Sequence, residues 1–374
     1  MTASPPQMPT VPTPVERVAG LSAAATAWAG GAELWVKRDD RTHPVYGGNK
    51  VRKLEGILAA ARARAATRLV TVGAAGSHHV LATAYFGREA GLEVEAVLVP
   101  QPRTEHVARV LRASVGCGVR AFPVGSWAAA APALGLRRLA GGGKAMLVPV
   151  GGSSVAGSMG YVEAARELAA QVRAGELPEP GVCVVALGSG GTAAGLAAGF
   201  ALEGLATRVV GVSVSDPAWL VALVAHGLAR ACVRRGLAAR RAAVRAAAAT
   251  ASGPTMEPST AAALLFEPAA PRLSVDARFL GGGYAHPTAE GREAIALAAE
   301  HAGLALDPTY TGKAFASALW HVRARRASHV LYWHTLSSAP LDALFPEAGA
   351  RARAPDEASL DPRLRALLLP ALSA

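Results

Sequence analysis

The sequence predicts an α/β fold in which parallel β-sheets are flanked by helices. Short apolar runs rich in valine and leucine alternate with longer alanine- and leucine-rich segments of helical periodicity, which is the pattern of βαβ units. The chain has 374 residues, of which 51% are apolar and 17% are charged. A chain of this length and composition can build two subdomains with cores of their own, so we expect two parallel-sheet cores.

In the first half of the chain, predicted helices and strands alternate after a proline-rich start. Apolar residues at helical spacing predict helices over residues 51–61 and 80–90. Apolar runs of strand length predict four strands, over residues 69–72, 94–99, 119–124 and 145–150. We assign these four strands to the first of the two sheets.

The second half returns to another sheet through a predicted helix over residues 155–172. Strands of that sheet are predicted at residues 182–187, 209–214 and 329–333. Residues 216–250 form a long alanine- and arginine-rich helical stretch, which we expect to pack on the sheet or on a second subunit. The sequence assigns no role to the tail at residues 351–374.

Composition bears on partners and location. The formal net charge is +11, but the arginines are scattered without a run of five, so we expect no nucleic-acid binding. The start of the chain resembles no secretory signal, and a Gly-Ser-Gly-Gly-Thr turn interrupts the uncharged stretch at 182–201, so we expect no membrane insertion. Three widely spaced cysteines predict unpaired thiols in a cytoplasmic protein and no metal site.

A glycine turn that leads into one lysine is the most informative segment of the chain. Gly47 and Gly48 precede Asn49 and Lys50 at the start of an amphipathic helix. A lysine buried beside a cofactor has a lowered pKa, and its amine can then form an imine. We predict that Lys50 holds a cofactor covalently and moves a substrate proton once it is released. The alternative is a surface lysine at a helix start.

A second glycine-rich turn follows the strand predicted at residues 182–187 and leads into an alanine-rich helix. The turn consists of Gly188, Ser189, Gly190, Gly191 and Thr192. Glycines let the backbone approach a ligand closely, and the amides at a helix start bind phosphate. The alternative is a turn that only packs a helix against a strand. A cofactor-holding lysine and a phosphate-binding turn together predict pyridoxal 5'-phosphate.

Four motifs in one order give the chain a resemblance to a known family. They are KRDD at 37–40, GGNK at 47–50, GSGGT at 188–192 and DPTYTGKA at 307–314. The chain resembles the D-cysteine desulfhydrase and 1-aminocyclopropane-1-carboxylate (ACC) deaminase family, within the tryptophan-synthase-β-like, fold type II pyridoxal phosphate enzymes.

This resemblance covers roughly residues 12–340 and implies a domain division. Residues 1–51 and 160–374 would form a large domain that binds the cofactor, and residues 52–159 would form a small mobile domain. The site would lie between the two domains, and the protein would be a homodimer.

The resemblance assigns roles to a helix start near residue 77. Ser77 would bind the substrate carboxylate or assist proton transfer, and Asn49 would contact the cofactor beside Lys50. His78 stands where the family has an asparagine near the phenolic oxygen of the cofactor, and His79 follows it as a further substrate-binding candidate. Histidine donates the same hydrogen bond as asparagine but is bulkier and titrates near neutrality. The alternative is a polar helix cap.

The second half carries four further site candidates by the same resemblance. Tyr310 would face the substrate as acid, base or positioning group, and Tyr284 corresponds to a second tyrosine of the site. Ring-opening deaminases have a glutamate at the position of Thr311, where it keeps the pyridine nitrogen of the cofactor protonated. Thr335 would lie near the cofactor, although Leu336 and the following serine replace two glycines of the family.

The function implied is β-elimination from a small amino acid such as D-cysteine, which gives ammonia, sulfide and a 2-oxo acid. A neutral Thr311 suits elimination, because a leaving group removes the electrons promptly. ACC deamination is the close alternative. A β-replacement enzyme of a specialised pathway and a non-catalytic paralogue that only binds the cofactor also stay open.

Overall fold

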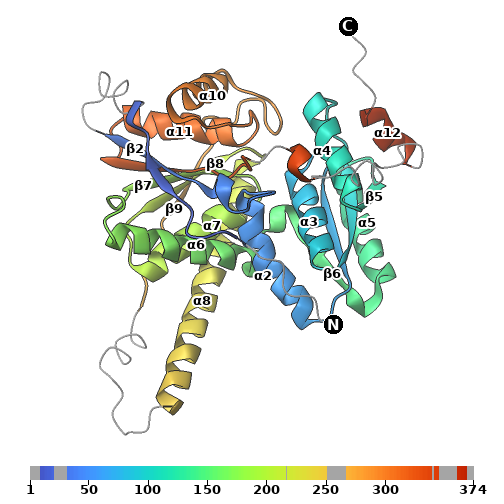
Figure 1. Ribbon diagram of the computed structural model, residues 1–374, viewed down its shortest axis with the longest axis horizontal. Coiled ribbons are helices and arrows are strands. Elements are labelled where there is room, and N and C mark those ends of the chain that lie inside the picture. The colour runs from blue at the N-terminus through green and yellow to red at the C-terminus, as the bar shows by residue number, and fades with distance from the viewer. Residues whose placement is uncertain are drawn as a thin grey trace. The chain divides into compact units, whose positions relative to one another are not determined.

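The chain folds into two compact units, each with its own β-sheet and flanking helices (Figure 1). The structure is a computed structural model that describes residues 9–20, 32–215, 217–250, 267–338, 341–344 and 360–368. Unit 1 comprises Met1–Val11, Asp40–Gly157 and Ser337–Ala374, and unit 2 comprises Pro12–Asp39 and Ser158–Leu336. The predicted α/β class with two sheet cores is confirmed, whereas the division into a cofactor-binding and a mobile domain stays a prediction.

Unit 1 holds a four-stranded parallel sheet in the order β5-β4-β3-β6. Its strands are β3 (Arg68–Ala74), β4 (Glu93–Val99), β5 (Arg120–Pro123) and β6 (Ala145–Val148). Its helices are α2 (Asn49–Ala63), α3 (His78–Glu89), α4 (Glu105–Gly116), α5 (Trp127–Ala140) and α12 (Pro362–Leu368). Short 3₁₀ turns are η1 (Asp39–Arg41, which begins in unit 2), η2 (Gly142–Lys144), η3 (Val150–Gly152) and η4 (Leu341–Leu344).

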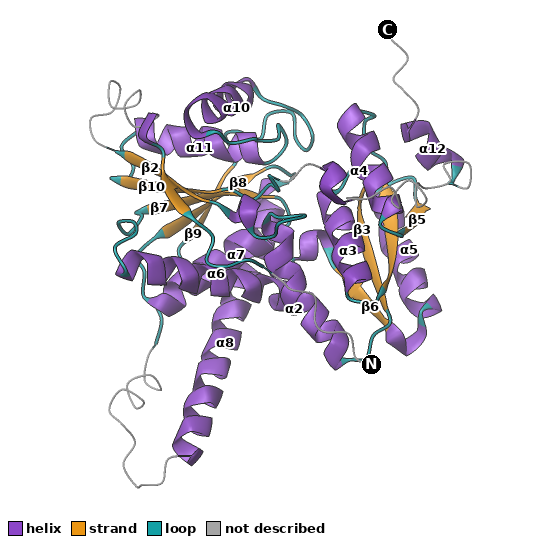
Figure 2. Ribbon diagram, in the orientation of Figure 1, coloured by secondary structure: helices purple, strands orange, loops and turns teal. Residues whose placement is uncertain are grey.

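Alternation along the strands gives this sheet two apolar faces. On β4, Val94, Ala96 and Leu98 join the core that also contains residues of α2, α3 and α4, whereas Val97 and Val99 pack with Ala130 of α5. Successive side chains of a strand point to opposite faces, so a strand that is covered on both sides carries mostly apolar residues. Helices accordingly cover both faces of the sheet (Figure 2).

Unit 2 holds a six-stranded sheet in the order β1-β2-β10-β7-β8-β9, in which only the β1–β2 pair is antiparallel. Its strands are β1 (Val15–Arg17), β2 (Glu33–Lys37), β7 (Val182–Leu187), β8 (Arg208–Ser213), β9 (Leu273–Asp276) and β10 (His329–Trp333). Its helices are most of α6 (Val155–Arg173), α7 (Gly191–Glu203), α8 (Ala218–Thr250), α10 (Ala289–Ala302) and α11 (Thr311–Arg323).

The same alternation divides the core of unit 2. On β10, Val330 and Tyr332 pack with residues of α10 and α11, whereas Leu331 and Trp333 pack with residues of α6 and α7. Figure 2 shows α10 and α11 on one side of the sheet, with α6 and α7 on the other. Helix α8, which covers most of the predicted stretch 216–250, packs against α7.

The structure describes part of the tail at residues 351–374 and all of the uncharged stretch at residues 182–201. Within the tail, Leu364 and Leu368 of α12 pack into the core of unit 1, so at least this part of it is structural. Residues 182–201 form β7, the glycine turn and most of α7. Among the described residues, none of the helices combines the length and apolar character needed to cross a bilayer.

Candidate active site

The lysine turn in unit 1 depends on both of its glycines. A Cβ at Gly47 would lie 2.1 Å from the carbonyl oxygen of Asp40, and Gly48 has a φ of 90°. Only glycine tolerates that crowding and adopts that φ without strain. Helix α2 therefore begins at a fixed place, and Lys50 is its second residue. The Nζ of Lys50 donates a hydrogen bond to Oδ1 of Asn49 at 2.7 Å, so Asn49 positions the amine.

A second lysine of α2 was missed by the sequence analysis. Lys53 lies one turn after Lys50 and is 2% exposed. Its Nζ donates to the carbonyl oxygen of Gly151 at 3.0 Å, which anchors η3 to α2. Burial, and then the charge of Lys50, holds the pKa of Lys53 well below its ordinary value. Its place on the apolar stripe of α2, next to Leu54, was the signal in the sequence.

The start of α3 places two of the predicted site residues. Ser77 is the N-cap of the helix, and its Oγ accepts from the backbone N–H of Val80 at 3.4 Å. His79 is buried, and its Nε2 lies 2.9 Å from the hydroxyl of Thr71. Burial, followed by the charges of Lys50 and Lys53, lowers the pKa of His79 to about 3. His79 is therefore neutral, and its role toward a substrate stays a prediction.

His78, the first departure from the family pattern, is part of a hydrogen-bonded chain. Its Nδ1 is 2.6 Å from the hydroxyl of Tyr46, and its Nε2 is 3.2 Å from Nε2 of His106. The rings of Tyr46 and His78 are stacked. Burial raises the pKa of Tyr46, so this phenol keeps its proton at neutral pH. A path of titratable groups thus runs from Tyr46 through His78 to His106.

Ser337, which belongs to the second departure from the family pattern, contacts the residue that follows Tyr46. The Oγ of Ser337 accepts a hydrogen bond from the backbone N–H of Gly47 at 3.0 Å. His78 binds the side chain of Tyr46, which is the residue before Gly47. Both departures therefore anchor the loop that leads to Lys50.

The turn between β7 and α7 in unit 2 has the geometry of an anion site. Gly190 has a φ of 88° and is the N-cap of α7, which begins without a side-chain cap. A Cβ at Gly188 would lie 3.1 Å from Cε1 of Tyr310, so a side chain there would crowd the ring. The turn continues through Ser189, Gly191 and the buried Thr192.

Two predicted tyrosines meet beside this turn. The hydroxyl of Tyr310 is 2.9 Å from the hydroxyl of Tyr284, and their rings pack edge to face. Burial raises the pKa of Tyr284, and it raises that of Tyr310 well above the ordinary value. Both phenols are protonated at neutral pH. Gly188, Tyr284 and Tyr310 therefore form one cluster in unit 2.

Thr311 is part of a tight loop that precedes α11. Its hydroxyl donates to Oδ2 of Asp307 at 2.6 Å and accepts from the backbone N–H of Asp307 at 2.7 Å. The same carboxylate accepts from the N–H groups of Thr309 and Tyr310. Because a hydroxyl has one proton, Thr311 has only acceptor capacity left for a cofactor. Asp307, which the sequence analysis did not assign, organises this part of the site.

Thr335 and the KRDD motif lie at the ends of strands β10 and β2. Thr335 follows β10 and is 8% exposed. In the KRDD motif, the Nζ of Lys37 donates to Thr13 and Gln171, and the carboxylate of Asp39 accepts from Tyr161 and Trp333. These contacts hold β2 to α6 and β10.

The fold and this site define a class of protein, the pyridoxal phosphate-dependent enzymes with parallel sheets. The sequence model described as "Pyridoxal-phosphate dependent enzyme" matches residues 7–335, and this chain belongs to that family. Its cofactor is pyridoxal 5'-phosphate, and the predicted family and fold are confirmed.

Two curated relatives and one solved structure cover most of the chain. Nocardicin C-9' epimerase of Nocardia uniformis subsp. tsuyamanensis is 33% identical over 342 residues, which are 90% of this chain and 93% of that protein. D-cysteine desulfhydrase of Salmonella paratyphi A is 33% identical over 351 residues, 90% of this chain and 94% of the relative. A crystal structure of an ACC deaminase homologue matches with a TM-score of 0.69 and 26% identity, over 89% of this chain and 93% of that one.

The described residues fit this cofactor. Helix α7 starts after a positive-φ glycine and has no capping side chain, which is the type of helix start that binds phosphate. Gly188 leaves the space that a Cβ would fill next to Tyr310. In unit 1, an amine held by Asn49 stands at the start of a helix. That Lys50 binds the aldehyde carbon of the cofactor and the 188–192 turn binds its phosphate stays a prediction.

Proposed function

We propose that this enzyme catalyses β-elimination from a small amino acid of the D-cysteine type and releases ammonia, sulfide and pyruvate. The observation that carries the proposal is the loop of Thr311, whose hydroxyl is bonded to Asp307. No carboxylate stands at position 311, so the pyridine nitrogen of a cofactor held there would lack the partner that ring opening uses. Elimination needs less delocalisation, because sulfur leaves with the electrons.

The chain supplies the proton transfers of this reaction. Bound pyridoxal phosphate makes the α-proton of the amino acid acidic. The Nζ of Lys50 takes that proton, and the Cβ–S bond breaks with its electron pair on sulfur. Tyr310 donates its proton toward Tyr284, so the proton of Tyr284 is free for the departing sulfur. The raised pKa of both phenols keeps these protons in place at neutral pH.

Product analysis tests the proposal directly. We expect the purified holoenzyme to form pyruvate and sulfide from D-cysteine faster than it forms 2-oxobutanoate from ACC, with both 2-oxo acids measured by chromatography. Faster formation of 2-oxobutanoate would make the protein an ACC deaminase and overturn the proposal.

The lysine assignment has a matched control in the same helix. Lys50→Ala should lose the visible absorption of the lysine-bound cofactor and at least about 10³-fold of the elimination rate. Lys53→Met, which removes the buried amine one turn further along α2, should keep that absorption. If Lys50→Ala retains a covalent lysine-bound cofactor, the role of Lys50 is wrong.

A second candidate function is epimerisation at the α-carbon. It is favoured by the Tyr46–His78–His106 chain, which gives unit 1 an acid–base group separate from the tyrosine pair of unit 2. Two separate groups can remove a proton on one side of the carbon and return it on the other. The relative named nocardicin C-9' epimerase supports this candidate.

Solvent deuterium distinguishes the two candidates. An epimerase incorporates deuterium into recovered amino acid of inverted configuration without forming a 2-oxo acid. His78→Asn, which restores the residue of the family, should then abolish inversion. In an elimination enzyme the same variant keeps pyruvate formation from D-cysteine.

We also propose a cytoplasmic homodimer. Trp219 and Leu223 of α8 are 69% and 65% exposed, which is unusual for large apolar side chains outside an interface. The three cysteines are buried and unpaired, as in proteins of a reducing compartment. Light scattering after size exclusion should give twice the mass of the chain, and Trp219→Glu with Leu223→Glu should reduce it to one.

A further inference from the structure

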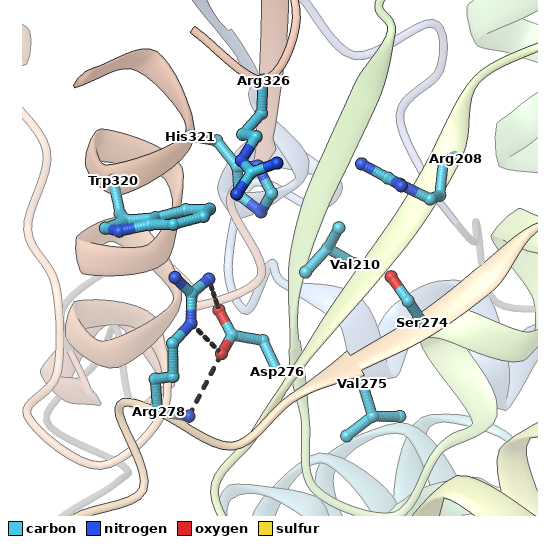
Figure 3. A pocket seen from close by; sticks show the side chains of 9 residues that line it. All are labelled: Arg208, Val210, Ser274, Val275, Asp276, Arg278, Trp320, His321 and Arg326. Carbon is cyan, nitrogen blue, oxygen red and sulfur yellow. Dashed lines mark hydrogen bonds and ion pairs between the residues drawn. The ribbon is translucent and has the colours of Figure 1, made fainter. Parts of the chain in front are cut away.

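Unit 2 contains a cavity of about 290 Å³ that the proposed reaction does not use. It is lined by side chains of β8, β9, α11 and the segments that follow β9 and α11 (Figure 3). The lining residues with polar or aromatic side chains are Arg208, Ser274, Asp276, Arg278, Trp320, His321 and Arg326.

The cavity lies away from the phosphate turn of the cofactor. Arg208 is the first residue of β8 and pairs with Val182, the first residue of β7, whereas Gly188 follows the last residue of β7. In a parallel pair these positions lie at opposite ends of the strands. An anion in this cavity is therefore distinct from the cofactor phosphate.

The arginines of the cavity carry charge in excess. Arg278 is paired with Asp276 through two hydrogen bonds of 2.9 and 2.8 Å, which neutralises one arginine. Within the described part of the chain, neither Arg208 nor Arg326 has a carboxylate partner. Figure 3 shows Arg326 and Arg278 on opposite faces of the Trp320 ring, with Arg208 extending from the other side of the cavity. Two positive charges, both on exposed residues, thus line the cavity without a carboxylate partner among the described residues.

His321 adds two unsatisfied polar atoms to the same wall. The residue is 5% exposed, and neither ring nitrogen has a hydrogen-bond partner among the described residues. Burial lowers the pKa of His321 to about 4, so the ring is neutral and has one N–H donor and one acceptor. A buried polar group without a partner destabilises a fold, unless a ligand supplies the partner.

We propose that this cavity binds a small phosphate-type anion between Arg208, Arg326 and His321. Two uncompensated guanidinium groups match the charge of a phosphate dianion. The donors come from β8, α11 and the segment after α11, so they approach from different directions, as the oxygens of a tetrahedral anion require. A phosphate oxygen accepts from the imidazole N–H, which satisfies one of the unpaired ring atoms.

The site is connected to Tyr284 through residues of unit 2. Asp276 accepts a hydrogen bond from Ser317 of α11 at 2.7 Å. Four residues earlier on α11, the buried Lys313 donates to the carbonyl oxygens of Leu280 and Gly283, just before Tyr284. These contacts connect the wall of the cavity to the segment that carries a tyrosine of the candidate active site.

Calorimetric titration of the holoenzyme with inorganic phosphate tests the proposal, because bound cofactor already fills the 188–192 turn. Arg208→Ala with Arg326→Ala should weaken phosphate binding by at least about 10-fold. The control is Arg234→Ala with Arg235→Ala, two exposed arginines of α8, which removes the same charge and should leave binding unchanged. Equal binding by both double variants would overturn the site.

A third variant separates the pocket from general charge effects. His321→Phe keeps an aromatic ring and all arginines but removes both ring nitrogens, so phosphate binding should weaken about 5-fold or more while the protein stays folded by circular dichroism. Unchanged binding would remove His321 from the site. Malonate should bind more weakly than phosphate, and tighter malonate binding would refute the phosphate class.

Discussion

Unit 2 contains two groups of polar residues, one around the buried Lys37 and Asp39 and one around the buried His321, that differ in how their hydrogen bonds are met. Around Lys37 and Asp39, the buried charges have partners from the same unit, including Glu167, Tyr161 and Trp333. Around His321, two ring nitrogens have no partner among the described residues, and Arg208 and Arg326 lack carboxylate partners there. The first pattern indicates a structural network, and the second indicates a site that awaits a ligand.

Removing a partner from the satisfied cluster should have the largest effect on stability. Asp39→Ala leaves the Tyr161 hydroxyl and the Trp333 Nε1–H buried without their acceptor, so the free energy of unfolding should fall by about 3–5 kcal/mol. Urea unfolding measures this loss. Glu300→Ala, whose side chain is 72% exposed, is the control and should change stability by less than about 0.5 kcal/mol. A loss no larger than that of the control would mean that the cluster is not structural.

Lowering the pH should reduce the stability of the protein through the buried ring of His321. Burial lowers the pKa of His321 to about 4, and Arg208, Arg278 and Arg326 lower it while Asp276 raises it. An unfolded histidine titrates near 6.5, so between about pH 6.5 and 4 the unfolded chain binds a proton that the folded chain does not. The free energy of unfolding should therefore fall as pH falls through this window, by up to about 3 kcal/mol.

The comparison that isolates this effect uses urea unfolding of the native protein and His321→Phe at pH 7.5, 5.5 and 4, without phosphate. Carboxylates titrate in both proteins, so only the difference between them reports on position 321. Parallel curves would show that His321 is not buried as a neutral ring.

At neutral pH, His321→Phe should have the smallest effect of these changes on the free energy of unfolding. Phenylalanine removes two polar atoms that lack partners, so the free energy of unfolding should stay the same or rise by up to about 1 kcal/mol. Calorimetry at pH 7.5 measures the change. A loss above about 2 kcal/mol would mean that the His321 ring has structural partners in solution, and the contrast between the two clusters would disappear.

The sequence predicted the elements whose apolar pattern is continuous. Strands β7 and β10 occupy the residues predicted for them, because both are buried on two faces and carry almost only apolar residues. Strands β2 and β9 were missed, since Glu33 and Lys37 leave the first only three apolar residues between them and Ser274 interrupts the short second. A charged residue inside a strand becomes intelligible only when its partner, which is distant in sequence, is known.

The sequence predicted those parts of the candidate site that depend on local sequence alone. The glycines at 47–48 and at 190 could be recognised, because close packing or a positive φ requires glycine there. Lys53 could have been recognised from its place on the apolar stripe of α2. The phosphate cavity could not, since it depends on residues from several elements. Position 311 was recognised by type, but the bonds that bind its hydroxyl to Asp307 depend on the shape of the loop.

The loop before Lys50 is secured at two neighbouring residues by the side chains that depart from the family pattern. Tyr46 is held through His78, and Gly47 through Ser337. Thr42 and His43 also hold this loop, through the carbonyl oxygen of Gly48 and the backbone N–H of Tyr46. Positions 78 and 337 therefore act on the same loop, and a redesign of substrate choice has to change them together.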